Sequence, residues 1–143
     1  MGYRQDRPPS RVPRFATLEP GLSALEQLAT CDPAVWMMLS TAARGDDAEA
    51  TRLLNERLRA TGTTVRVRRV ARGWVLVAAG APEMAATSLL SLAELISADG
   101  WRRVKTCEKT SCTTMFIDRT NGNSSRFCRS HRRVFARKSS AGQ

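Results

Sequence analysis

Two short pairs of soft ligand residues near the end of the chain constrain its fold more than any other feature. Cys107 and Cys112 form a C-x4-C pair, and after fifteen intervening residues Cys128 and His131 form a C-x2-H pair. Thiolate and imidazole ligands in two close pairs are typical of a tetrahedral zinc ion. Four protein ligands leave no open position for water or substrate, so the spacing predicts one structural Zn²⁺. The alternative is buried free thiols and a histidine with ordinary hydrogen-bond partners.

The residues between the two pairs predict how the ligands converge. A short apolar run at 115–117 is followed by Asn121-Gly122, which is a strong hairpin signal because both residues tolerate positive φ. We expect a hairpin there to bring Cys128 back towards the first pair.

A helix is expected from Cys128 onward, with Ser124 or Ser125 as its N-cap. At about 100° per residue, Cys128, His131 and Phe135 share one face of that helix. The predicted module is therefore a knuckle, a hairpin and a helix that meet at the metal, an arrangement like a treble clef.

The positive charge of the chain is concentrated in the same region. Of a formal net charge of +10, residues 101–143 carry eleven basic and two acidic residues, whereas residues 21–100 carry eight basic and nine acidic ones. Such asymmetry favours a nucleic acid or another acidic surface as partner. The candidate DNA contacts are Arg119, Asn121, Asn123, Arg126, Arg129, Arg132, Arg133, Arg137 and Lys138. For the two asparagines, turn chemistry is an equally good explanation.

This segment resembles the C-terminal zinc finger of the bacterial CGNR family, over about the last 40 residues. The elements that carry the resemblance are Cys107-x4-Cys112, Phe116-Ile117-Asp118-Arg119, the turn at 121–126, Phe127-Cys128 and the basic stretch 132–138. The Cys-Gly-Asn-Arg tetrapeptide is absent, and His131 takes the place of the family's last cysteine at an earlier position. Members of the family are regarded as DNA-binding transcription regulators, so the resemblance implies that role.

Upstream of the finger, the sequence predicts a small helical body with one β-hairpin, so that the fold class is α+β. Helical patterns run over 18–30, from Asp32-Pro33, from Asp46 to Gly62 and over 82–98. Alternating residues at 65–70 and 74–77 around Arg72-Gly73 predict the hairpin. The expected organisation is a flexible basic arm (1–17), the body (18–100), the finger (101–138) and a disordered tail (139–143).

No apolar run is long enough for a membrane span, so we expect a cytoplasmic protein. The basic finger and the family resemblance favour a nucleoid-associated, DNA-binding transcription regulator. An alternative is a zinc-stapled protein-interaction module that contacts RNA polymerase or a sigma factor. A winged helix-turn-helix, with Arg66 and Arg68 on the wing, is a further alternative. An enzyme is disfavoured, since the lone histidine is assigned to zinc and no Gly-rich phosphate loop is present. The sequence leaves open the oligomeric state and whether the body binds a small effector, for example in a pocket lined by Trp36.

Overall fold

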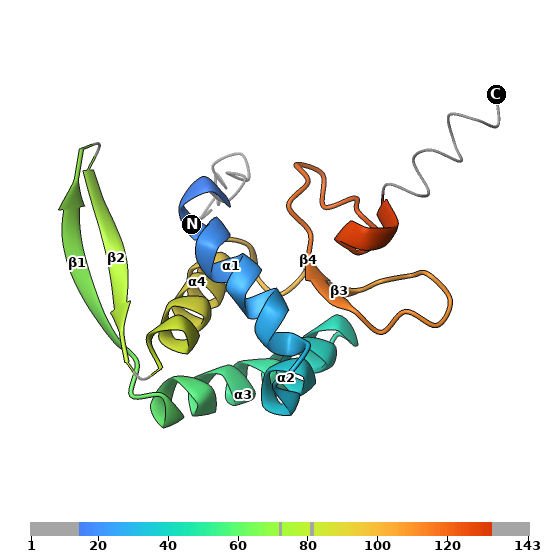
Figure 1. Cartoon of the computed structure of the whole chain (residues 1–143), viewed down its shortest axis with the longest axis horizontal. Helices are drawn as coiled ribbons and strands as arrows, with labels where there is room; N and C mark the ends of the chain where they lie inside the picture. The colour runs from blue at the N-terminus through green and yellow to red at the C-terminus, as the bar shows by residue number, and fades with distance from the viewer. Residues whose placement is uncertain (1–14, 72, 81, 133–143) are drawn as a thin grey trace, which may run out of the picture.

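The computed structural model describes residues 15–71, 73–80 and 82–132 (Figure 1). Its elements, in chain order, are α1 (Phe15–Ala29), α2 (Pro33–Ala43), α3 (Asp47–Ala60), β1 (Thr64–Val70), β2 (Gly73–Ala79), α4 (Glu83–Asp99), β3 (Val104–Thr106) and β4 (Met115–Ile117). The predicted mixture of a helical body, a hairpin and a C-terminal Cys/His module is confirmed. Within the described residues, no helix is both long and apolar enough to cross a membrane.

Helix α1 lies against α4 along a buried stripe. Leu22 and Leu25 are completely buried, at the three-residue spacing expected of one helix face. The two helices are in tight contact at Gly21, where an added Cβ would lie 1.9 Å from the Ser91 hydroxyl oxygen. The helix begins at Phe15, three residues earlier than predicted, so residues 15–17 are not part of an arm. The rest of the predicted arm, and the predicted tail, lie outside the described residues.

The starts of α2 and α3 follow their sequence signals. The Asp32 carboxylate accepts hydrogen bonds from the backbone N–H groups of Ala34 and Val35, at 3.0 and 3.4 Å, and Pro33 opens the helix. Asp46 caps α3 in the same way, through Glu49 N at 3.2 Å. Helix α2 is less buried than its apolar sequence predicts, because Trp36 lies at the surface with its indole N–H 3.5 Å from the Thr113 carbonyl oxygen.

One hydrophobic core joins the body to the finger. It contains residues from all four helices together with Trp101, Val104, Met115 and Ile117 of the C-terminal region. The predicted boundary at residue 100 therefore separates two stretches of sequence that share a core. Strand β4 explains this geometrically, because Met115 and Ile117 face the body while Phe116, pointing to the other side, packs beside the cysteines.

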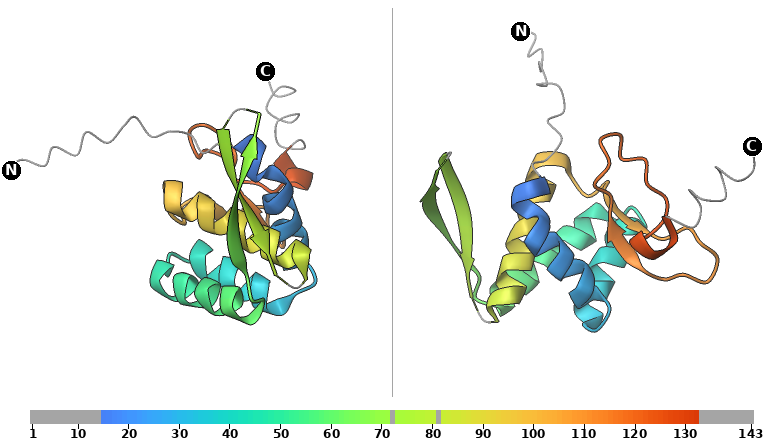
Figure 2. Two further views of the ribbon diagram at one scale, coloured as in Figure 1. Left: turned by 90° about the vertical axis from the view of Figure 1, so that its left-hand side faces the viewer. Right: turned by 45° about the horizontal axis from the view of Figure 1, so that its top comes forward.

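The two sheets are both antiparallel hairpins, but they have different surroundings. Strands β1 and β2 pair with Val67 opposite Leu76, around the turn that the sequence predicts. This hairpin stands beside the helices, on the opposite side of the molecule from the finger (Figures 1 and 2). Strands β3 and β4 pair with Lys105 opposite Phe116. The loop between them carries the first cysteine pair, so the finger's hairpin closes at the knuckle and not at Asn121-Gly122 as predicted.

Candidate metal centre

The four predicted ligands converge on one point. The Sγ atoms of Cys107, Cys112 and Cys128 and a ring nitrogen of His131 all lie within 4.8 Å of one another. Nδ1 of His131 is 3.4 Å from Cys107 Sγ and 3.2 Å from Cys128 Sγ, and the Cys112 and Cys128 sulfurs are 4.0 Å apart. Tetrahedral bonds of ordinary length to zinc place two sulfurs about 3.8 Å apart and a sulfur and a nitrogen about 3.6 Å apart. The donor set and its spacing thus fit one structural zinc ion.

The first pair of ligands is shaped by the loop between β3 and β4. Cys107 N donates to the Thr114 carbonyl at 2.9 Å, which extends the strand pairing by one step, and Cys112 N donates to the Lys109 carbonyl at 3.0 Å. Ser111 has a φ of 68°, in the left-handed region, and so turns the chain back just before Cys112. These turns bring two residues five positions apart to one ion.

The second pair lies at the start of a helical turn over 129–132. His131 N and Arg132 N both donate to the Cys128 carbonyl, at 3.0 and 2.9 Å. Cys128 therefore occupies the N-cap position that was predicted for Ser124 or Ser125. The reason is that both serines belong to the preceding loop. The predicted shared face is confirmed for Cys128 and His131, whereas Phe135 lies outside the described residues.

The thiols of the cluster have different environments. Hydrogen bonds from the side chain and backbone of Thr114 lower the pKa of Cys112. Burial, in contrast, raises the pKa of Cys128. Phe116 and Phe127 pack around this cluster, so water has little access to its inner side. A buried thiol of raised pKa is held as thiolate when a divalent cation neutralises it.

A buried carboxylate organises the loop that was predicted to be a tight hairpin turn. The Asp118 side chain accepts hydrogen bonds from Thr120 N at 2.8 Å and from Ser125 N at 2.7 Å, and forms an ion pair with Lys105 Nζ at 2.6 Å. Although burial raises it, the pKa of Asp118 is held below its usual value by these partners. The loop folds around this carboxylate and not around a two-residue turn. That is why Asn121-Gly122 does not connect two strands.

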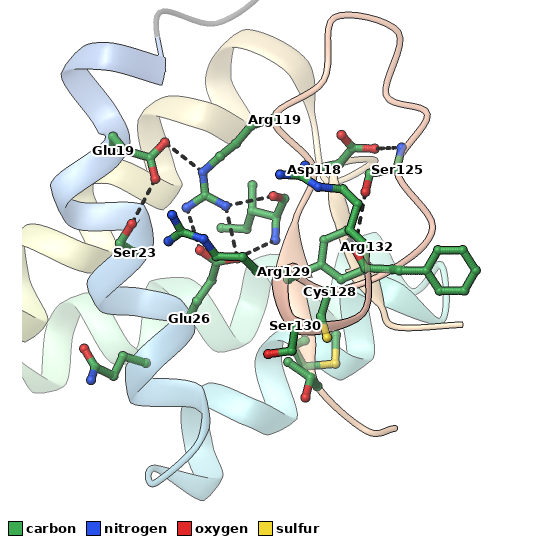
Figure 3. Close-up of a pocket in the computed structure, with 16 residues that line it drawn as sticks. Glu19, Ser23, Glu26, Asp118, Arg119, Ser125, Cys128, Arg129, Ser130 and Arg132 are labelled. Atoms are coloured by element: carbon green, nitrogen blue, oxygen red, sulfur yellow. Dashed lines mark hydrogen bonds and ion pairs between the residues drawn. The ribbon is translucent and has the colours of Figure 1, made fainter. Parts of the chain in front are cut away.

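Arg119 joins the finger to α1. Its guanidinium group forms ion pairs with Glu19 at 2.8 Å and with Glu26 at 2.5 Å (Figure 3). Glu26 also accepts the backbone N–H of Ile117 at 3.0 Å, so it caps the free side of β4. This arginine was predicted to contact DNA, but the structure commits its charge to two carboxylates of the body.

The other predicted DNA contacts fall into three groups. Arg126 pairs with Glu108, and the Asn123 side chain donates to the Arg102 carbonyl at 3.1 Å, in a residue whose φ of 53° reflects a turn role. Asn121, Arg129 and Arg132 are exposed. The remaining three, Arg133, Arg137 and Lys138, lie outside the described residues.

A cleft of about 650 Å³ lies between α1 and the finger. Its walls have mixed charge, with Glu19 and Glu26 on the side of the body and Arg129 and Arg132 on the side of the finger (Figure 3). Ser130, also in its lining, belongs to the ligand-bearing turn. The cleft therefore follows the seam between the metal module and the body.

The sequence patterns did not identify the residues that hold the finger in place. Asp118 had a signal, because an aspartate two residues before a threonine is typical of an Asx-turn. For Glu19 and Glu26 the sequence gives a weaker indication, because their spacing of seven residues places both on one face of a helix. No sequence feature indicated the role of Lys105. Its Nζ also donates to the carbonyls of Asn123 and Ser125, at 2.8 and 2.9 Å.

Comparison with known families agrees with this geometry. A family model described as CGNR zinc finger matches residues 103–141. No curated protein matches the chain. The match covers the β3–β4 hairpin and all four converging ligands. The C-terminal segment of this chain is therefore similar to the CGNR zinc finger, with Cys107, Cys112, Cys128 and His131 as the site of one structural zinc ion.

Proposed function

We propose that this protein is a DNA-binding transcription regulator whose zinc finger docks on duplex DNA, and that it acts by binding rather than by catalysis. The observation that carries the proposal is the way the finger divides its basic residues. Some are neutralised by carboxylates and hold the fold together, while others are exposed beside the metal site.

The neutralised basic residues contact carboxylates of the body or of the finger itself. Each member forms an ion pair within the described residues: Arg102 and Arg103 with Asp99, Lys105 with Asp118, Arg119 with Glu19 and Glu26, and Arg126 with Glu108. Arg103 is almost completely buried, so its role is structural. Arg103, Lys105 and Arg119 therefore have little free charge to offer a phosphate backbone. Arg102 and Arg126 are paired but remain more than half exposed.

The second group is available to a partner. Within the described residues, Lys109, Arg129 and Arg132 are exposed and form no ion pair. The last two lie on the helical turn that carries His131, and Lys109 lies in the knuckle between Cys107 and Cys112. The metal ligands thus belong to two segments that present exposed positive charge. Although burial raises the pKa of Glu19, Arg119 and also Arg129 lower it, so Arg129 lies near a carboxylate of the body without forming an ion pair with it. Arginine side chains at such positions neutralise phosphates and, in the major groove, bind guanine edges.

Arg133, Arg137 and Lys138 follow this turn in the sequence and stay predicted contacts. With them, about six basic residues would meet phosphates, so log affinity should fall with log salt at a slope near −5. An association of this kind places the protein at the nucleoid.

The test is duplex binding by the zinc-loaded full chain. We would measure fluorescence anisotropy with a short random-sequence duplex, over a series of salt concentrations, before and after chelation. The matched pair of variants is Arg129→Glu/Arg132→Glu in the finger and Arg66→Glu/Arg68→Glu in the β1–β2 hairpin, which change the net charge equally. Binding should be lost on chelation and in the finger variant, and should persist in the hairpin variant.

The opposite pattern would support the winged helix-turn-helix. Its would-be recognition helix, α3, opens with Asp47 and Glu49 behind the Asp46 cap, and a phosphate backbone repels such a start. If neither variant nor chelation alters DNA binding, the finger is not the DNA site. A role in contacting RNA polymerase or a sigma factor would then take precedence.

A further inference from the structure

The β1–β2 hairpin carries a surface that the proposed function does not use. Cross-strand pairs share a face, and one face holds Val65, Val67, Trp74 and Leu76, exposed by 52%, 64%, 67% and 44%. Arg69 lies on the same face, with its guanidinium group 5.8 Å from the centre of the Trp74 ring. At the base of the hairpin this face is covered, because Ala78 packs against Ala86 and Leu90 of α4. A two-stranded hairpin is marginally stable alone, and an apolar patch left in water marks an interaction site.

The opposite face of β1 carries unpaired positive charge. Arg66 lies across from Val77 and Arg68 lies across from Val75. Within the described residues, neither arginine forms an ion pair, and the sequence contains no aspartate or glutamate between Glu56 and Glu83. The hairpin therefore has positive charge that nothing in its own stretch of chain neutralises.

Among the strands of the described residues, none but β2 pairs with β1, so its other edge has no strand beside it. All seven residues of the strand are exposed, and it is β2 that packs against α4. In Figure 1 and in the right view of Figure 2 the hairpin stands to one side of the helices. An edge strand has backbone N–H and C=O groups that point away from its partner strand, and these can pair with an added strand.

We propose that the edge of β1 binds an extended segment of a partner protein in which acidic and apolar residues alternate. Added as a third strand, such a segment would place its carboxylates beside Arg66 and Arg68 on one face. Its apolar side chains would then lie beside Val65 and Val67 on the other. One alternating sequence would thus neutralise the arginines on one face of the hairpin and cover apolar side chains on the other.

The same observations weigh against two other occupants. Duplex DNA would neutralise the arginines but would leave Val67, Trp74 and Leu76 uncovered. A second copy paired through β1 would bring arginines together. A two-fold axis at Val67 sets Arg66 opposite Arg68 of the other copy, and an axis at Arg66 or Arg68 sets that arginine opposite itself. Like charges directly opposite each other are destabilising.

The experiment uses the zinc-loaded full chain and a fluorescent peptide in which glutamate alternates with valine. Control peptides have the same composition in scrambled order, or lysine in place of glutamate. We expect Arg66→Glu/Arg68→Glu to weaken binding of the glutamate peptide at least tenfold and to gain binding of the lysine peptide. The finger variant Arg129→Glu/Arg132→Glu should bind the glutamate peptide as the wild type does, whether or not the finger binds DNA.

The position of the peptide is checked by hydrogen exchange, which should slow at the amides of residues 64–70 and not in the finger. The proposal is overturned if the peptide does not bind, or if the scrambled peptide or the hairpin variant binds equally well. If the hairpin variant loses affinity for duplex DNA while the finger variant keeps it, the proposal is wrong and the hairpin is a DNA-binding surface. A concentration-dependent dimer that Val67→Ser/Trp74→Ser abolishes would assign the surface to a second copy.

Discussion

Arg119 of the zinc finger and Glu26 of helix α1, 93 residues apart in sequence, form an ion pair at 2.5 Å. The same carboxylate accepts the backbone N–H of Ile117 in strand β4. The finger therefore does not hang from the body by a linker but is bonded to its first helix. Loss of the metal should therefore lower the stability of the body, and loss of contacts in the body should lower the stability of the finger.

Replacement of Glu26 should separate the two effects of this carboxylate. Glu26→Gln loses the charge but keeps an oxygen for Ile117 N–H, whereas Glu26→Ala loses both. Because a charged partner is left without its mate in a partly buried site, we expect a loss of about 1–3 kcal/mol for the alanine variant, and less for the glutamine variant. Denaturant unfolding of the zinc-loaded protein measures both. Equal stability of all three proteins would show that the contact contributes nothing.

Removal of zinc should unfold the finger and lower the stability of the body as well. Cys128→Ser or chelation removes the tie between the knuckle and the helical turn. Since Val104, Met115 and Ile117 belong to the main core, their release exposes part of it. We expect most of the helical circular dichroism signal to persist at room temperature but to be lost at a lower melting temperature. Cys31→Ser, at an exposed cysteine outside the cluster, is the control and should melt like the wild type. An unchanged melting temperature without zinc would mean that the two parts fold independently.

Acid should weaken the loop around Asp118. Hydrogen bonds from Lys105, Thr120 and Ser125 outweigh burial and lower the pKa of this carboxyl group. A carboxyl group whose pKa is lowered in the folded state stabilises the protein at pH values above its ordinary pKa of about 4. This contribution disappears as the pH falls through the folded-state pKa. Asp118→Asn should thus cost about 1–3 kcal/mol at neutral pH, with a difference from the wild type that vanishes on acidification. Denaturation of both proteins at matched pH tests this. A difference that stays constant with pH would show that charge is not the cause.

The division of the arginines predicts different effects on DNA binding. Arg132→Gln removes an exposed charge and should reduce the salt slope by about 1, if that residue contacts a phosphate. Arg119→Gln should leave the slope unchanged and instead lower stability, because Arg119 is paired with Glu19 and Glu26. Anisotropy titrations at several salt concentrations, together with denaturation of each variant, separate the two. A reduced slope in Arg119→Gln alone would reverse the assignment.

The close contact of α1 with α4 predicts a steric effect at Gly21. A methyl group there would meet Ser91 Oγ at 1.9 Å and the Thr87 carbonyl at 3.0 Å, so Gly21→Ala should force the helices apart at a cost of about 1–3 kcal/mol. Adding Ser91→Gly removes the nearer clash and should restore part of the loss. Thermal melts of the single and double variants provide the measurement. No recovery in the double variant would assign the cost to the backbone carbonyl.

The metal site was predictable because its information is local. Four ligand residues within 25 positions, in two close pairs, are typical of one metal ion, and the structure brings their ligand atoms within 4.8 Å of one another. The caps at Asp32 and Asp46 and the turn of the β1–β2 hairpin are local for the same reason, since each depends on residues two to four positions apart. Local chemistry of this kind acts before the rest of the chain is folded.

The roles of the charged residues and the exposure of the hairpin depended on the tertiary structure. Arg119 looks like its neighbouring arginines in the sequence, and only folding places it beside carboxylates 93 and 100 positions away. The alternating residues of β1 and β2 predicted a hairpin, but not that Val65, Val67, Trp74 and Leu76 would be left exposed on one face. Residue type and spacing determined which atoms hold the ion. Which charges are free, and which apolar face is left in water, was decided by how distant segments came together, because such contacts depend on position in space rather than on order in the chain.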